Sequence, residues 1–128
     1  MADTDMADTE RAKRGKEMRE RLFGNAPPPS ETFERLMGVT NEHLFGDIWT
    51  RPDLAVRDRS LITCAVLTAL GKEAQLRVHM KGALNVGISR EEILEMMVHL
   101  AHYSGWPTAV NGTRVAEEVF KEADEAEG

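Results

Sequence analysis

The sequence has little that would support a disulfide-bonded or membrane-embedded protein. It contains one cysteine, Cys64, which excludes an internal disulfide framework and is typical of a reducing compartment, so we expect a cytoplasmic protein. The longest apolar run, around residues 61–70, is interrupted by Thr63 and Thr68 and is too short to cross a bilayer. The first residues have no apolar core, so we also expect no secretory signal.

An excess of basic charge is also lacking. The 16 lysines and arginines are outnumbered by 22 aspartates and glutamates, which gives a formal net charge of −6. Basic residues do gather in residues 11–21, but there they alternate with Glu17 and Glu20, which favours a solvated helix face. We therefore expect no nucleic-acid partner, because binding to phosphates needs a basic surface.

What is present indicates an all-α protein. The 128 residues, of which 41% are hydrophobic and 30% charged, suit a single domain with one modest core. No segment alternates apolar and polar residues for long enough to predict a strand. We predict five or six helices, over residues 9–23, 31–45, 54–70, 72–85, 89–104 and from 106 onward. The predicted boundaries are an N-terminal helix and Pro-rich linker (1–29), the main domain (30–123) and an acidic tail (124–128) that frays.

The helix ends carry local signals. Ser89 and Glu92 have the spacing of a capping box, and Ile88 and Ile93 that of a hydrophobic staple. Pro107 suits the first turn of the last helix. We further expect Gly71, Gly87 and Gly105 to end helices and Asp53 to cap the helix over residues 54–70. Gly38 and Thr40 weaken the middle of the predicted helix 31–45.

Two chemistries can be considered from residue types alone. Glu95, His99 and His102 share one side of a predicted helix, and imidazole and carboxylate are zinc or iron ligands. No second cluster completes such a shell, so we predict no metal site. Cys64 lies among aliphatic residues that would raise the pKa of its thiol, so we interpret it as a core residue rather than a nucleophile.

A third set of candidates consists of Arg51, Arg57 and Arg59, which flank the start of the apolar helix, and His79 in the middle of the next helix. Spacing alone assigns these residues no function.

The ordered motifs of residues 57–120 resemble the carboxymuconolactone decarboxylase family. They are Arg-x-Arg-x-Leu-Ile-Thr, a mid-helix histidine followed by Gly-Ala-Leu, Gly-Ile-Ser-x-Glu-Glu-Ile, and Tyr-x-Gly-x-Pro. The resemblance extends over about residues 33–120. It implies an alkylhydroperoxidase/carboxymuconolactone decarboxylase-like helical fold.

Within that family the sequence resembles the decarboxylase branch. The alkylhydroperoxidase-like branch carries Cys-x-x-Cys-x-x-x-His, but Lys72 and Gln75 stand where its two cysteines would be, and Ser60 stands in place of its glutamate. Thiol peroxidase chemistry needs an attacking and a resolving thiol. The resemblance therefore implies a carboxy-lyase rather than a peroxidase.

The decarboxylase branch converts 4-carboxymuconolactone to 3-oxoadipate enol-lactone and carbon dioxide, without a cofactor, in the protocatechuate branch of aromatic catabolism. The resemblance implies that His79 donates a proton to carbon and that Arg59 binds a carboxylate. We assign a catalytic role to Tyr103 as well, as a donor to the developing oxyanion. Further candidates for the substrate site are Arg51, Arg57, Glu42 and Trp49.

Alternatives remain open at the level of the sequence. The chain could be a lyase or hydrolase for another small lactone or oxo-acid, or a non-catalytic oligomeric binding protein of the same fold. The resemblance also implies a homo-oligomer, a trimer or hexamer, with which the apolar helix faces containing Met18, Met37, Met80, Met96 and Met97 agree.

Overall fold

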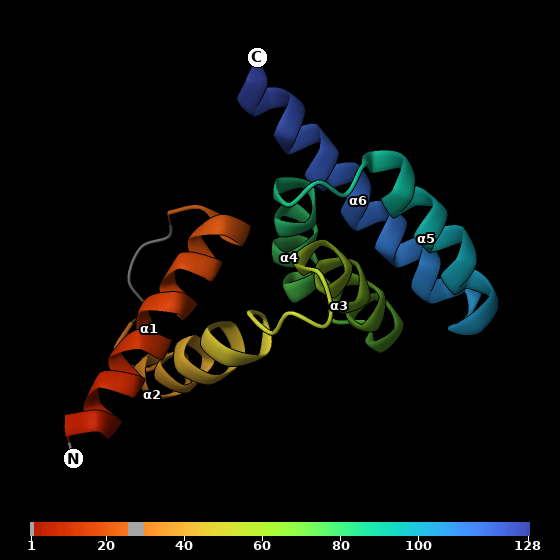
Figure 1. The fold of residues 1–128 in the computed structure, drawn as a ribbon. Coiled ribbons are helices and arrows are strands. Elements are labelled where there is room, and N and C mark those ends of the chain that lie inside the picture. The colour runs from red at the N-terminus through yellow and green to blue at the C-terminus, as the bar shows by residue number, and fades with distance from the viewer. Residues whose placement is uncertain (1, 26–29) are drawn as a thin grey trace. The chain divides into compact units, whose positions relative to one another are not determined.

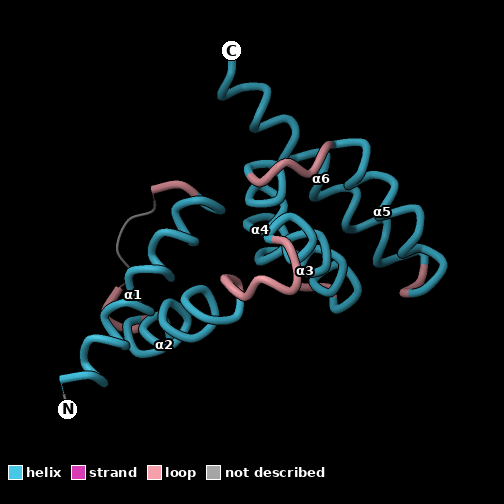
Figure 2. Tube along the Cα trace, in the orientation of Figure 1, coloured by secondary structure: helices cyan, strands magenta, loops and turns pink. Residues whose placement is uncertain are grey.

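The computed structural model describes residues 2–25 and 30–128, and all of these lie in helices or in the loops between them (Figure 2). The prediction of an all-α fold is therefore confirmed. The chain divides into two compact units, one ending at Val56 and one running from Arg57 to Gly128. Along the chain, the helices are α1 (Ala2–Phe23), α2 (Glu34–Val39), η1 (Thr40–Ile48), α3 (Val56–Leu70), α4 (Glu73–Asn85), α5 (Arg90–Tyr103) and α6 (Trp106–Glu127) (Figure 1).

In the first unit, α1 packs closely against η1. Two glycines permit this approach: a Cβ atom at Gly15 would overlap the backbone oxygen of Asn41, and one at Gly46 would overlap that of Arg11. The Nη1 of Arg19 also donates to Asn41 Oδ1, at 3.2 Å. The two helices thus meet backbone to backbone, which no larger residue at either glycine would allow.

Aromatic side chains fill the small core of the first unit. Leu22, Phe45 and Trp49 are buried there. The ring of Phe45 lies edge-on to Phe23, at 5.8 Å between centroids, and 5.7 Å from Trp49. Such aromatic pairs add to the free energy gained by burial.

The predicted helix over residues 31–45 is in fact two segments with different winding. The α-helical part ends at Val39, and residues Thr40–Ile48 form a π-helix. The hydroxyl of Thr40 bonds to the carbonyl oxygen of Leu36 at 2.8 Å, a side-chain contact that bends helices. The change of winding therefore begins where the sequence weakened the helix prediction.

The second unit contains the main hydrophobic core, built by α3, α4, α5 and α6. Its buried members are Cys64, Leu76, Met80, Ala83, Ile88, Ile93, Met97, Val115, Ala116 and Val119. Gly112 brings α6 close to α3 and α5, because a Cβ atom there would lie 2.8 Å from Thr68 Cγ2 and 2.7 Å from Met97 Sδ. Between helices, ion pairs join Arg77 to Glu118 and Glu122, and Arg90 to Asp124.

Most predicted helix ends of the second unit are confirmed. The Ser89–Glu92 capping box is present in both directions, with 3.0 Å for each hydrogen bond. Gly71, Gly87 and Gly105 all have positive φ between helices, a conformation that glycine adopts without strain. Pro107 lies in the first turn of α6.

Two predictions about helix ends were wrong. Helix α3 begins at Val56, so Asp53 is too far upstream to cap it. The acidic tail, predicted to fray, continues α6 to Glu127 in the structure, and the ion pair between Arg90 and Asp124 joins it to the start of α5.

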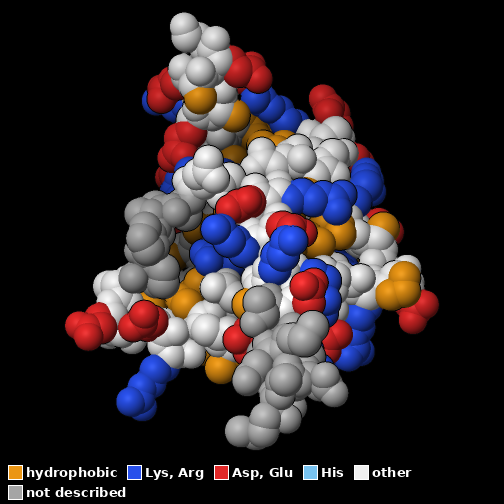
Figure 3. Space-filling model, turned by 60° about the vertical axis from the view of Figure 1, so that its left-hand side comes forward, with side chains coloured by type: hydrophobic (Ala, Val, Ile, Leu, Met, Phe, Trp, Pro, Cys, Tyr) orange, Lys and Arg blue, Asp and Glu red, His pale blue; other side chains and the backbone are white. Residues whose placement is uncertain are grey.

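Charged side chains of both signs lie close together on the face shown in Figure 3. Among the described helices, none combines the length and the apolar character needed to cross a bilayer.

Candidate functional site

His79 lies in the middle of α4, in the second unit, and its imidazole is half-buried. Burial lowers the pKa of this histidine below its ordinary value of 6.5, because a charged imidazolium is poorly solvated there. His79 is therefore mostly neutral at pH 7, able to hold or pass a proton but not a permanent cation.

Arg57 lies in the first turn of α3 and pairs with Glu92, in the first turn of α5. Glu92 is fixed from both sides, because it also accepts the backbone N–H of Ser89 in the capping box. The hydrogen bond from Arg57, followed by those from Ser89, lowers the pKa of Glu92 to about 2. A second carboxylate, that of Asp58, lies 3.7 Å from Arg57. The sequence indicated the cap at Glu92 but not its partner Arg57, which lies 35 residues away.

Arg59 is half-buried one position past Asp58, and Ser60 follows it. The Ser60 side chain has no exposed surface, and its Oγ has no hydrogen-bond partner in the described part of the chain. A buried hydroxyl without a partner is unusual in a native fold. The first turn of α3 thus carries two arginines together with an unused donor.

Tyr103 lies at the last turn of α5 and is 81% exposed. Its ring stacks on His99, with 4.9 Å between centroids. Glu92 is eleven residues earlier on the same helix, and a rise of about 1.5 Å per residue places it roughly 16 Å away along the axis. Within one chain, Tyr103 and the Arg57–Glu92 pair therefore lie at opposite ends of α5.

Three predicted substrate-site residues belong to the first unit. Glu42 is half-buried in η1, Trp49 is buried against Phe45, and Arg51 bonds to Asp47 with 3.3 Å between Nε and Oδ1. This hydrogen bond lowers the pKa of Asp47. Glu42 thus lies in the first turn of η1, whereas Trp49 and Arg51 follow its end.

The two other residues considered for chemistry, Cys64 and His102, make contacts within the fold. Cys64 is buried in the core of the second unit, and burial raises the pKa of its thiol to about 12. The Nδ1 of His102 lies 2.8 Å from the carbonyl oxygen of Val98, and its ring lies edge-on to Trp106. In residues 2–25 and 30–128, no group of three or more metal-binding side chains converges.

An apolar groove of about 490 Å³ lies between α3 and α5. Its lining residues are Leu61, Ile62, Ala65, Glu92, Glu95, Met96, His99 and Leu100. The charged groups among them are carboxylates, so this groove suits apolar or cationic groups better than a dianionic lactone. His79 is not among its lining residues.

The sequence profile of the carboxymuconolactone decarboxylase family matches residues 34–118. The match covers most of the second unit and the part of the first that holds α2 and η1. The chain therefore belongs to the carboxymuconolactone decarboxylase family, and the prediction from the sequence motifs is confirmed.

Three curated relatives are similar to the chain. The 4-carboxymuconolactone decarboxylase of Acinetobacter baylyi is 34% identical over 126 residues, which cover 91% of this chain and 92% of the relative. The nitrosuccinic acid decarboxylase npaB of Metarhizium robertsii is 30% identical, over 84% of this chain and 73% of the relative. An uncharacterized 15.0 kDa protein of Paracoccus denitrificans is 31% identical, over 66% of this chain and 64% of the relative.

Proposed function

We propose that the protein is a cofactor-free carboxy-lyase that converts 4-carboxymuconolactone to 3-oxoadipate enol-lactone and carbon dioxide. The observation that carries this proposal is the similarity to the Acinetobacter enzyme, which extends over nine tenths of both chains. A second relative with a different substrate is also named a decarboxylase, which supports the same type of reaction. The single cysteine is buried as a thiol, in agreement with a cytoplasmic location.

The reaction needs few protein groups. The bond between the lactone ring and its carboxylate breaks, and carbon dioxide leaves. The electron pair delocalises through the ring double bond to the lactone carbonyl as a dienolate, and a proton then adds to carbon. One proton is consumed for each carbon dioxide released. The protein must therefore hold the retained carboxylate, stabilise the oxyanion and supply the proton.

We assign the proton donor role to His79. Its half-buried position in α4 keeps the imidazole partly shielded from water, and the lowered pKa makes its protonated form a stronger acid than an ordinary imidazolium. Arg59 and Arg57 would bind the retained carboxylate, because guanidinium groups bind carboxylates in a bidentate manner. The pairing of Arg57 with Glu92 leaves further donors, since a guanidinium carries five N–H groups.

The remaining candidates belong to the surroundings of the substrate. Tyr103 would donate to the oxyanion. Because it lies at the far end of α5 from Arg57, it would reach such a site from a neighbouring copy of the chain. Glu42, Trp49 and Arg51 remain candidates for contacts to the substrate, all of them in the first unit.

We further propose that the chain forms a homo-oligomer, a trimer or hexamer. Of the methionines named from the sequence, Met18, Met80 and Met97 are buried inside the units, so other side chains must form the contacts. Large apolar residues are exposed along a groove of about 420 Å³ between α5 and α6. They are Leu94, Val98, Trp106 and Val110, and surfaces of this kind mark interfaces.

Turnover of 4-carboxymuconolactone, followed by ultraviolet absorbance, tests the proposed reaction. We expect decarboxylation without added metal, unaffected by a chelator, and its loss in His79→Ala. His102→Ala is the matched control, because this histidine is exposed and points to Trp106. An inactive parent protein would refute the substrate, and an active His79→Ala variant would refute the proton donor.

A second candidate substrate is nitrosuccinate, which is favoured by the relative from Metarhizium. A nitro group accepts the electron pair left by carbon dioxide, much as the conjugated lactone does, so the same residues could serve. Assaying both compounds with the parent protein decides between them through kcat/KM. Turnover of nitrosuccinate alone would replace the lactone as the substrate and leave the reaction type unchanged.

The oligomer is tested by light scattering after size-exclusion chromatography. We expect the parent protein to have a multiple of the 14.3 kDa chain mass. Val98→Asp should lower that mass while circular dichroism still shows helix. A parent protein of single-chain mass would contradict the proposal.

A further inference from the structure

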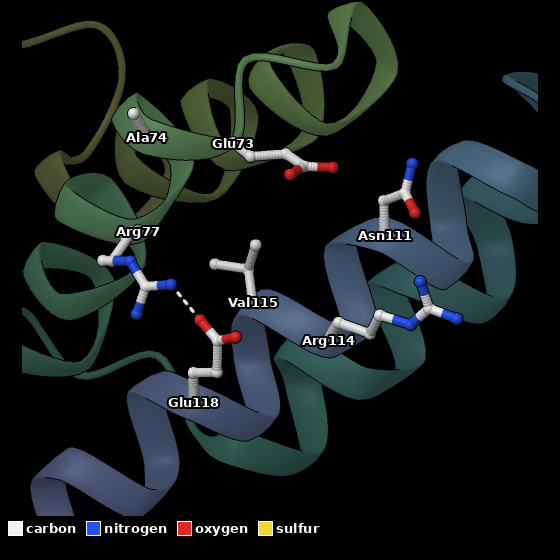
Figure 4. Close-up of a pocket in the computed structure, with 7 residues that line it drawn as sticks. All are labelled: Glu73, Ala74, Arg77, Asn111, Arg114, Val115 and Glu118. Atoms are coloured by element: carbon white, nitrogen blue, oxygen red, sulfur yellow. Dashed lines mark hydrogen bonds and ion pairs between the residues drawn. The ribbon is translucent and has the colours of Figure 1, made fainter.

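A polar cleft of about 400 Å³ separates α4 from the middle of α6 (Figure 4). Its volume lies in the range of small-molecule sites. Seven residues line it: Glu73, Ala74 and Arg77 from α4, and Asn111, Arg114, Val115 and Glu118 from α6. Buried Val115 gives the cleft an apolar surface between its charged walls. The cleft lies wholly within the second unit.

One end of the cleft is closed by a balanced ion-pair network. Arg77 bonds to Glu118 and Glu122, and Lys81 lies 2.5 Å from Glu122. Two positive and two negative side chains therefore satisfy one another there. This end of the cleft is therefore held rigidly and leaves no unpaired charge for a ligand.

The other end carries opposite charges that do not meet. In Figure 4 the Glu73 side chain extends from α4 toward the turn of α6 that carries Asn111 and Arg114, and no hydrogen bond or ion pair joins these three. The side-chain amide of Asn111 offers both donors and an acceptor. A carboxylate and a guanidinium thus face one cleft from opposite walls, with a neutral polar group beside them.

From this arrangement we propose that the cleft binds a small molecule that carries both a carboxylate and an ammonium group, such as a short amino acid. The ligand carboxylate binds Arg114 and Asn111, and its ammonium group binds Glu73. The charged lining residues sum to zero, with Glu73 and Glu118 against Arg77 and Arg114. An anion alone would meet two carboxylates and a cation alone two guanidinium groups, so the zwitterion is favoured.

This site is separate from the proposed catalytic residues. Arg77 and His79 are two positions apart in α4, and residues at that spacing point in different directions from a helix. A ligand in the cleft therefore need not displace a substrate near His79. The inference stands whether or not the chain decarboxylates a lactone.

The test uses 4-aminobutyrate as the probe, with butyrate and butylamine as its single-charge analogues. Each is titrated into the full chain, and shifts of the Asn111 side-chain amide and of the backbone amides of residues 73, 114 and 115 are followed by NMR. We expect saturable shifts with 4-aminobutyrate and about fivefold weaker binding of each analogue, the factor expected for losing one partly exposed ion pair.

Variants locate the site. Glu73→Gln and Arg114→Gln should each weaken 4-aminobutyrate binding about fivefold. Glu95→Gln, which removes an exposed carboxylate from the groove between α3 and α5, should leave it unchanged. The double exchange of Glu73→Arg with Arg114→Glu should restore binding, since the probe can turn around. Absence of saturable shifts, equal binding of butyrate, or equal weakening by Glu95→Gln would overturn the proposal.

Discussion

Arg57, at the start of α3, is paired with Glu92, the residue that also closes the capping box at the start of α5. One carboxylate therefore fixes the first turns of two helices, and one of these turns carries Arg57 and Arg59, the proposed substrate-binding arginines. Glu92, which caps α5, thus also links the starts of α3 and α5.

This link should make the stability of the protein depend on pH in the acidic range. Arg57, and after it Ser89, lower the pKa of Glu92 from its ordinary 4.5 to about 2. The stabilisation is therefore present above about pH 4.5 and is lost as the pH falls toward 2. Glu92→Gln should be less stable than the parent protein at neutral pH, and the difference should shrink below pH 4.5.

Urea unfolding at several pH values, monitored by circular dichroism, measures this difference. Glu91→Gln, in the same turn of α5 but without a bond to Arg57, serves as the control. A difference between Glu92→Gln and the parent protein that stays constant from neutral pH to pH 2 would contradict the assignment.

The close contact between α1 and η1 predicts that a larger residue at Gly15 destabilises the first unit. Gly15→Ala places a Cβ atom onto the backbone oxygen of Asn41, and two helix backbones must separate to relieve it. We expect the free energy of unfolding of the first unit to fall by about 2–3 kcal/mol. Gly38→Ala is the control, because nothing lies within 4 Å of its added Cβ and alanine favours helix.

Trp49 reports on this unit because it is buried beside Phe45. With Trp106→Phe as background, tryptophan fluorescence follows the first unit alone. Equal unfolding midpoints of the Gly15→Ala and Gly38→Ala variants would show that the backbones do not meet as described.

Predictions from the sequence were correct where residues close together in the chain decide the local structure. Ser89 and Glu92 are three residues apart, and Gly87 and Gly105 need only their own backbone freedom, so these helix ends were correct. The π-helical winding from Thr40 was missed because it depends on packing between helices. Gly46 must approach α1, and the carbonyl oxygen of Gly46 accepts a hydrogen bond from Arg14 Nε at 3.1 Å.

The candidate site shows the same division. His79 and Arg59 were identified as site residues from the ordered motifs, and their catalytic roles remain predictions. The pairing of Arg57 with Glu92 spans two helices, and no local pattern specifies it. The cleft around Arg114 was also missed, because its residues come from α4 and α6 and form no motif in either segment.

Cys64 should react slowly in the folded protein. Burial in the core raises the pKa of its thiol to about 12, and only the thiolate attacks. We expect labelling by a thiol reagent at neutral pH to be slow in the native state and fast in urea. Rapid labelling of the native protein would instead favour the redox chemistry of the other family branch.

Turnover should increase as the medium becomes acidic if His79 donates the proton. Burial lowers the pKa of His79 from 6.5, so the imidazolium form is minor at pH 7 and grows as the pH falls. At pH values well above that lowered pKa, the rate should rise up to about tenfold per pH unit of acidification. The pH profile of kcat/KM for the decarboxylation measures this, with His79→Gln expected to lack the rise.

Protonation of His79 should lower the stability of the fold, whereas it should raise the rate of turnover. Because the unfolded state binds the proton more readily than buried His79 does, stability decreases as the pH falls below 6.5. Circular dichroism at each pH therefore separates a true change in rate from loss of folded protein. A folded protein whose kcat/KM decreases steadily from pH 7 to pH 5.5 would show that a neutral or deprotonated group, and not the imidazolium of His79, limits the reaction.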